Sequence, residues 1–313
     1  MRIAFLFPGQ GSQYVGMGAD LYKALPVVRE TFDEADRILG MALSDLCFNG
    51  PKEELQKTVN TQPAVLTTSI ACYRVLLERG IRPDAVAGHS LGEYSALVAA
   101  GAIRLSDAVP LVRLRGQLMQ DAVPLGTGGM MAVLGLDEQR LEEVRREASA
   151  FGLIEMANFN CPGQIVLAGE TPALEQAVKL AKQAGAKRSV LLAVSGPFHS
   201  SLMRGAGERL AEVLENVEIN TPSVPVVANV NASLLQDANQ VRAALVRQIY
   251  SPVRWTDCVQ RLLDNGMDAF IEVGPGKVLC GLVKKIANRD ILLLNVEDLD
   301  SLEKSVARLQ EVV

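Results

Sequence analysis

The sequence has few of the residues that mark metal sites, disulfide frameworks or membrane spans. It contains only two histidines, and its five cysteines are scattered without any C-x-x-C pair, so we expect neither a bound metal nor a disulfide framework. Unpaired cysteines of this kind indicate reduced core residues in a reducing compartment. No stretch approaches the about 18 unbroken apolar residues of a membrane span. We therefore expect a cytoplasmic protein with no membrane partner and no cofactor of its own.

Aromatic residues and positive charge are also in short supply. The formal net charge is −5, and a chain without surplus Lys and Arg lacks what neutralises phosphates in non-specific nucleic-acid binding. We therefore expect no nucleic-acid partner. With 4% aromatic and 49% hydrophobic residues, the composition favours an Ala- and Val-rich α/β fold over a β-sandwich. At 313 residues the chain is long enough for two domains or for one domain with an insertion.

Apolar strands and amphipathic helices alternate in the first and last thirds of the chain, which predicts a mainly parallel sheet covered by helices. We predict strands at 3–7, 85–87, 224–230, 269–273 and 291–295, and helices at 27–39, 63–79, 107–121, 201–214, 238–249, 255–264 and 276–287. Residues 126–195 instead follow the order βαββαβ, which is the ferredoxin-like order. The prediction is a discontinuous large domain, 1–125 and 196–313, with a small domain, 126–195, inserted into it.

The segment AVAGHSLGEYSALVAAGA, residues 85–102, sets a serine between a short apolar run and an Ala-rich helix. Residues 88–92 fit the pattern G-x-S-x-G, which predicts a sharp strand-to-helix turn with an exposed serine hydroxyl at Ser90. The start of the helix would aim backbone N–H groups, that of Leu91 first, at an oxyanion formed beside Ser90. Because such short patterns also arise by chance, a serine that merely caps a helix is the alternative.

A serine hydroxyl needs a general base at neutral pH, and the chain offers only His89 and His199. His89 adjoins Ser90 in the turn, where neighbouring side chains diverge, so it is poorly placed to take the proton. His199 lies in the segment SGPFHSS after a predicted strand, at the sheet edge where Ser90 is also expected. His199 is therefore the candidate base, and a purely structural histidine is the alternative.

Arg115 is predicted to lie on an apolar helix face. Its neighbours three and four residues away are Leu111, Val112, Leu118 and Met119. An arginine in such surroundings is costly unless an anion meets its guanidinium group. Two partners remain open, namely an Asp or Glu of the protein and the carboxylate of a substrate held beside the serine.

Two glycine-containing segments, PGQGSQ at 8–13 and VGPGKVL at 273–279, follow predicted strands. Neither has the spacing of the common nucleotide-binding patterns. From the residues alone, PGQGSQ is equally well a phosphate-binding loop or a structural turn. We interpret VGPGKVL as a strand, a turn and the start of a helix.

Several ordered motifs resemble the malonyl-CoA:acyl carrier protein transacylase family. They are FLFPGQGSQYVGMG at 5–18, GHSLGE at 88–93, Arg115, GPFHS at 196–200, QIYSPVRWT at 248–256 and VGPGKVL at 273–279. The resemblance runs nearly end to end. It implies an α/β fold with a hydrolase-like core and an inserted ferredoxin-like subdomain. It also implies an acyltransferase that moves malonyl from malonyl-CoA to the phosphopantetheine thiol of acyl carrier protein, for fatty acid or polyketide synthesis.

The resemblance implies a role for each candidate residue. Ser90 would carry malonyl as an ester, His199 would be its base, and Arg115 would clamp the free malonyl carboxylate. The other implied site residues are Leu91 as the main oxyanion donor with Gln10 beside it, Gln248 whose backbone carbonyl orients the histidine in place of an aspartate, and Asn158, Met119 and Phe198 at the substrate. A bulky residue at the position of Phe198 goes with malonyl rather than methylmalonyl in this family.

The acidic carrier protein would require a basic docking surface on this chain. The candidates are two pairs of basic residues, Lys187 with Arg188 and Lys284 with Lys285, although solvated pairs without a partner are common. No long amphipathic extension is present, so we expect a monomer. Two rival functions remain open: a serine hydrolase, which has no use for Arg115, and a non-catalytic malonyl sensor, in which Ser90 is never acylated.

Overall fold

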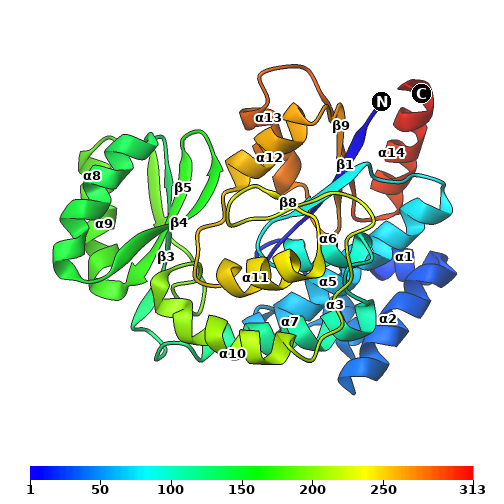
Figure 1. Ribbon diagram of the computed structural model, residues 1–313, viewed down its shortest axis with the longest axis horizontal. Coiled ribbons are helices and arrows are strands. Elements are labelled where there is room, and N and C mark those ends of the chain that lie inside the picture. Colours follow the sequence, from blue (N-terminus) through cyan, green and yellow to red (C-terminus); the bar gives the residue numbers. More distant parts are fainter. Residues whose placement is uncertain (313) are drawn as a thin grey trace.

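The computed structural model describes residues 1–312 as two sheets with helices around them (Figure 1). Six strands form the larger sheet in the order β10-β9-β1-β2-β7-β8. They are β1 (Ile3–Phe7), β2 (Ala85–Gly88), β7 (Val226–Val227), β8 (Leu234–Leu235), β9 (Ala269–Val273) and β10 (Leu292–Val296). All neighbours pair in parallel except β7 and β8. The predicted α/β class with a mainly parallel sheet is confirmed.

Helices cover both faces of the larger sheet because its strands are apolar on both sides. Phe5 and Phe7 point into one core cluster, and the alternate residues Ala4 and Leu6 point into another. The helices are α1 (Ala19–Ala24), α2 (Pro26–Leu39), α3 (Leu43–Asn49), α4 (Lys52–Leu55), α5 (Thr58–Glu78), α6 (Gly92–Ala99), α7 (Leu105–Gln120), α10 (Arg204–Leu214), α11 (Ala238–Gln248), α12 (Trp255–Asp264), α13 (Val278–Ile286) and α14 (Leu299–Val312).

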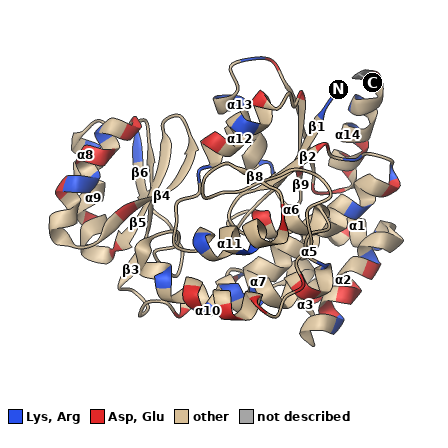
Figure 2. Ribbon diagram, viewed as in Figure 1, with Lys and Arg blue, Asp and Glu red and all other residues tan. Residues whose placement is uncertain are grey.

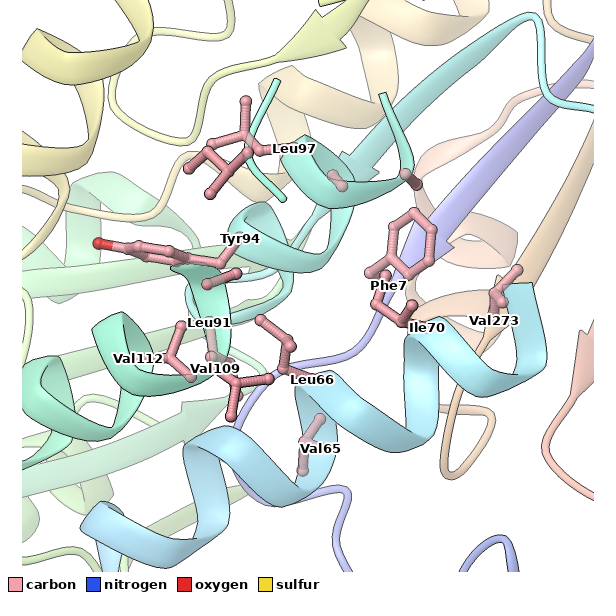
Figure 3. Packing of buried hydrophobic residues seen from close by; sticks show 14 of the residues in the cluster. Phe7, Val65, Leu66, Ile70, Leu91, Tyr94, Leu97, Val109, Val112 and Val273 are labelled. Carbon is pink, nitrogen blue, oxygen red and sulfur yellow. The ribbon is translucent and has the colours of Figure 1, made fainter. Parts of the chain in front are cut away.

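Helices α5 and α7 pack against the start of α6 and the residue before it. Leu91 and Tyr94 pack beside Leu66 of α5 and beside Val109 and Val112 of α7 (Figure 3). All five side chains are almost completely buried. The start of α6 is therefore held rigidly against the core.

The smaller sheet has the strand order β4-β5-β3-β6, and all its neighbours are antiparallel. Its elements are β3 (Gly128–Leu134), α8 (Glu138–Ala148), a 3₁₀ turn (Ser149–Phe151), β4 (Ile154–Cys161), β5 (Gln164–Glu170), α9 (Thr171–Gln183) and β6 (Arg188–Leu191). Met131 and Val133 pack in a cluster with α8 and α9, which cover the face turned away from the larger sheet (Figure 1). Met130 and Val166 face the other way and join the main core.

Some predicted boundaries are wrong. The strand predicted at 224–230 is only Val226–Val227, because the Asn229 side chain donates to the carbonyl oxygen of Gly88 and the chain then turns back as β8. The helix predicted from residue 63 begins at Thr58, where α7 packs closely against it at Gly116. The short helices α1, α3 and α4 are not predicted, since six, seven and four residues show no clear helical period.

The five cysteines are unpaired, and four of them are buried, whereas Cys280 is half-buried. Within residues 1–312, no helix is both long and apolar enough to cross a membrane. The same residues contain no cluster of three or more His, Cys, Asp or Glu side chains suited to a metal ion.

Candidate active site

Ser90 lies in the turn between β2 and α6, at the carboxyl edge of the larger sheet. Its φ of 53° falls in the left-handed region, which is strained for a residue other than glycine. Gly88 and Gly92 make the turn possible, since a Cβ on Gly88 would lie 1.9 Å from the backbone of Gly92. The G-x-S-x-G spacing therefore has a steric cause, and the turn exposes the hydroxyl of Ser90.

Asn229, which follows β7 and is fully buried, holds this turn in place. Its Oδ1 accepts a hydrogen bond from the N–H of Ser90 at 2.7 Å, and its Nδ2 donates to the carbonyl oxygen of Gly88 at 2.7 Å. The sequence does not point to Asn229, because a single asparagine after an apolar run carries no pattern of its own.

His199 contacts the hydroxyl of Ser90, with Nε2 2.7 Å from Oγ. Its other nitrogen, Nδ1, lies 2.8 Å from the backbone carbonyl oxygen of Gln248. A carbonyl only accepts, so Nδ1 carries the proton and Nε2 is free to accept one from the serine. Burial and the positive charge of Arg115 lower the pKa of His199 to about 3, which keeps the imidazole neutral at pH 7.

Arg115 comes from α7 and is 1% exposed. It donates from Nη1 to Oε1 of Gln62 at 2.8 Å, and from Nη2 to Oε1 of Gln248 at 2.8 Å and to Oγ of Ser90 at 3.2 Å. No carboxylate in the described part of the chain pairs with it directly. The alternative that an Asp or Glu side chain forms an ion pair with Arg115 is therefore wrong. The guanidinium is held by neutral oxygens, and Nε has no partner among them.

A cavity of about 190 Å³ opens beside these three side chains. Part of its lining lies on or next to strands of the smaller sheet: Met130, Asn158, Asn160, Val166, Leu192 and Val194. The other lining residues are Gln10, His89, Ser90, Leu91, Arg115, Met119, Phe198 and His199. The structure thus brings Gln10, Asn158, Met119 and Phe198 to the same space. Gln248 lies behind Arg115 and His199 and is not part of the lining.

The backbone N–H groups of Leu91 and Gln10 lie beside the cavity and have no acceptor within residues 1–312. Leu91 precedes α6, so its N–H also lies at the positive end of that helix. The side chain of Gln10 donates to Thr58 Oγ1 at 3.1 Å, which fixes the first glycine turn against α5. The two free donors are suited to an oxyanion.

His89 turns away from the serine and pairs with a residue of the smaller sheet. Its Nε2 lies 2.9 Å from Oδ1 of Asn160, and its ring packs 5.5 Å from that of Trp255, measured between ring centroids. Burial lowers the pKa of His89. Neither Asn160 nor Gln62 is predicted from the sequence. Gln62 follows Asn60 and Thr61 along α5, so no local pattern singles it out.

The four basic candidates lie on two elements. Arg188 begins β6 with Lys187 before it, and the blue start of β6 is visible in Figure 2. Leu192, which follows β6, lines the cavity. Lys284 and Lys285 occupy the last turn of α13. All four side chains are exposed, and none forms a salt bridge with a residue of the described chain.

Comparisons with known proteins identify the family of this chain. A family model described as an acyl transferase domain matches residues 4–302. The malonyl CoA-acyl carrier protein transacylase of Bacillus subtilis (strain 168) is 50% identical over 311 residues, which cover 99% of this chain and 98% of the relative. The protein of the same name from Escherichia coli (strain K12) is 50% identical over 288 residues, or 92% of this chain and 93% of the relative.

Solved structures are equally similar. An acyl-carrier-protein S-malonyltransferase from Burkholderia pseudomallei 1710b has a TM-score of 0.95 and 49% identity, with 98% of this chain and 100% of the other covered. A complex of a type II polyketide synthase acyl-carrier protein with its malonyl-transacylase gives a TM-score of 0.96 and 48% identity, with 98% and 100% covered. The chain therefore belongs to the malonyl CoA-acyl carrier protein transacylase family.

Proposed function

We propose that this chain transfers a malonyl group from malonyl-CoA to the phosphopantetheine thiol of an acyl carrier protein, with Ser90 as the covalent carrier. One observation supports this above all others. The Ser90 hydroxyl lies 2.7 Å from a neutral imidazole nitrogen and 3.2 Å from a buried guanidinium group without a carboxylate partner. A nucleophile, its base and an anion-binding group thus meet at one end of a small cavity.

In the first half-reaction, Nε2 of His199 takes the proton of Ser90 while Oγ attacks the thioester carbonyl of malonyl-CoA. The carbonyl oxygen becomes an oxyanion, which the N–H groups of Leu91 and Gln10 stabilise. When the tetrahedral intermediate collapses, the C–S bond breaks and His199 returns its proton to the coenzyme A sulfur. The products are the malonyl ester of Ser90 and free coenzyme A.

The second half-reaction runs the same steps with a different nucleophile. His199 takes the proton of the phosphopantetheine thiol, and the sulfur attacks the ester carbonyl of malonyl-Ser90. The C–O bond to Ser90 breaks, and Oγ receives the proton back from His199. The carrier protein leaves as a malonyl thioester, and the enzyme returns to its starting state.

Arg115 gives the cavity its preference for an acyl group with a free carboxylate. A carboxylate can replace the neutral oxygens of Gln62 and Gln248 on the guanidinium and gain a charge-assisted, two-pronged contact. Phe198 and Met119, 5% and 2% exposed, limit the space beside it and favour malonyl over branched acyl groups. A hydrolase acting on uncharged esters would have no use for this arginine.

The fold supports transfer rather than hydrolysis. We assign residues 126–195 to an inserted ferredoxin-like subdomain and residues 1–125 and 196–313 to a hydrolase-like core. The smaller sheet supplies Met130, Val166 and Leu192 to the cavity wall, an apolar cover that disfavours water at the ester. The acidic carrier protein would dock on Lys187 and Arg188 and on the Lys284–Lys285 pair.

The proposal is tested by intact-protein mass spectrometry after brief mixing with malonyl-CoA, and again after adding phosphopantetheinylated carrier protein. We expect a malonyl adduct on the wild type but not on Ser90→Ala, and we expect the adduct to move to the carrier. An adduct lost to water would indicate a hydrolase. The absence of any adduct would favour the malonyl sensor.

A further inference from the structure

Glu93 is a buried carboxylate that lies beside the active site without lining its cavity. It stands in the first turn of α6 and is 0% exposed. Its Oε2 accepts hydrogen bonds from Nε2 of Gln248 at 2.7 Å and from the N–H of Asn229 at 3.1 Å, whereas Oε1 has no partner. No Lys, Arg or His within residues 1–312 forms an ion pair with it. Burying an acid without a cationic partner in this way is costly.

The Gln248 side chain connects Glu93 to Arg115. Its Nε2 donates to Glu93 and, at 2.9 Å, to the carbonyl oxygen of Ser90, while its Oε1 accepts from Nη2 of Arg115 at 2.8 Å. An ionised carboxylate only accepts hydrogen bonds and a guanidinium only donates them. Together the two charged groups favour the orientation in which the NH₂ end of the Gln248 amide faces Glu93 and its oxygen faces Arg115. A single oriented amide therefore separates two buried opposite charges.

The second contact of Glu93 leads to the strained turn. The N–H of Asn229 is bound by Glu93, and the side chain of Asn229 holds the N–H of Ser90 and the carbonyl of Gly88. Glu93 thus touches both residues that support the site from behind, Gln248 and Asn229. The shortest hydrogen-bonded path from Glu93 to Arg115 runs through the Gln248 amide.

We infer that Glu93 is a positioning residue that orients the Gln248 amide, and through it Arg115, and so sets the preference for acyl groups with a free carboxylate. The inference rests on the proposed function. A carboxylate in direct contact with Arg115 would compete with the substrate carboxylate for the guanidinium. Because the Gln248 amide lies between them, Glu93 supplies negative charge near Arg115 without occupying the guanidinium N–H groups. These groups bind neutral oxygens that a substrate carboxylate can displace.

The substitution Glu93→Gln separates charge from shape. It keeps the size of the side chain and one acceptor oxygen for Gln248 and Asn229, but it removes the charge that fixes the Gln248 amide. The amide introduced at position 93 can also turn its NH₂ group toward Gln248, which then loses one of the two acceptors of its Nε2 and holds Arg115 less firmly. We expect Arg115 to lose one of its partners and its orientation.

The experiment measures the rate of Ser90 acylation by malonyl-CoA and by acetyl-CoA at about pH 8, above the pKa of about 7 to which burial raises Glu93. We expect Glu93→Gln to lower the malonyl-to-acetyl ratio by about tenfold or more, the usual scale for a lost hydrogen bond to a charged group. Because Glu93 acts through Arg115, adding Glu93→Gln to Arg115→Ala should change that ratio no further.

Glu272→Gln is the matched control. Glu272 in β9 is also 0% exposed, also has an unpartnered Oε1, and also has a pKa raised by burial to about 7, but it binds the N–H of Cys280 and none of the site residues. A merely structural effect would change stability in both variants and leave both ratios unchanged. Gln248→Met, which keeps the backbone carbonyl for His199, should reproduce the loss of discrimination and serves as the second variant should Glu93→Gln not fold.

The inference is overturned if the malonyl-to-acetyl ratio of Glu93→Gln equals that of the wild type. It is also overturned if the double variant loses as much of this ratio as the two single variants together. Failure of the proposed function would look different, because wild-type enzyme would then form no malonyl adduct, or would lose it to water.

Discussion

Nη2 of Arg115 lies 3.2 Å from Oγ of Ser90, so the group that we expect to bind the acyl carboxylate also touches the atom that we expect to attack the thioester. Because the guanidinium can only donate, Ser90 accepts from Arg115 and directs its own proton to His199. The positive charge also favours the developing alkoxide. Recognition and activation are thus coupled at one oxygen atom.

Arg115→Ala should reduce acylation by malonyl-CoA by at least about 100-fold. This is the scale expected when a buried charge pair, here the guanidinium and the malonyl carboxylate, loses one partner. Acylation by acetyl-CoA should fall much less, since acetyl has no carboxylate for the clamp. Both rates can be followed by mass spectrometry of the acyl-enzyme. Arg113→Ala is the control, because Arg113 lies on the same helix but is only half-buried. Equal losses on both substrates would contradict the assignment of Arg115 as a clamp.

His199 should remain neutral well below the usual histidine range. Burial and the charge of Arg115 lower its pKa to about 3, and burial also lowers the pKa of His89. The chain has only two histidines, so NMR of labelled imidazoles in tag-free protein can resolve both. We expect the His199 signals not to titrate between about pH 8 and about pH 5, although this range includes the ordinary histidine pKa of about 6.5.

In Arg115→Ala the midpoint of the His199 titration should move upward, because one of the two largest causes of the low pKa is removed. A His199 midpoint near 6.5 in the wild type would contradict this electrostatic description. His89→Asn assigns the two sets of signals.

The sequence predicts the parts of this site that depend on local pattern, and it misses the parts that depend on distant contacts. The turn at Ser90 follows from the spacing of Gly88 and Gly92, and the burial of Arg115 follows from apolar neighbours one helical turn away. Gln62, Asn229 and Glu93 meet their partners across 53, 139 and 155 residues, respectively. Such contacts leave no local period. Only Glu93 has a local signal, because Ala96 and Leu97 place it on an apolar helix face.

The stability of Glu272→Gln relative to the wild type should increase as the pH rises. Burial raises the pKa of Glu272 from 4.5 to about 7, so the folded state holds a proton that the unfolded state has released. The stability contributed by that proton is fully present below pH 4.5 and is lost as the pH rises through about 7. The full shift corresponds to about 3 kcal/mol.

The measurement is the difference in melting temperature between Glu272→Gln and the wild type at several pH values. We expect the difference to move in favour of the variant as the pH rises from about 5 to about 8. A difference that is independent of pH would show that Glu272 has an ordinary pKa in the folded state.

Ser90→Gly should be more stable than Ser90→Ala although neither variant can be acylated. Both remove the hydroxyl, but alanine retains a Cβ at a φ of 53°, whereas glycine adopts that conformation without strain. The expected gain is about 1 kcal/mol.

Ala232 has a φ of 54° and is not part of the cavity lining, so Ala232→Gly should gain a similar amount while keeping wild-type acylation. Thermal unfolding of the three variants and the wild type measures both effects. If Ser90→Gly gained nothing over Ser90→Ala while Ala232→Gly was stabilised, the turn would be relaxed in solution, and the strain at Ser90 would have no part in presenting its hydroxyl.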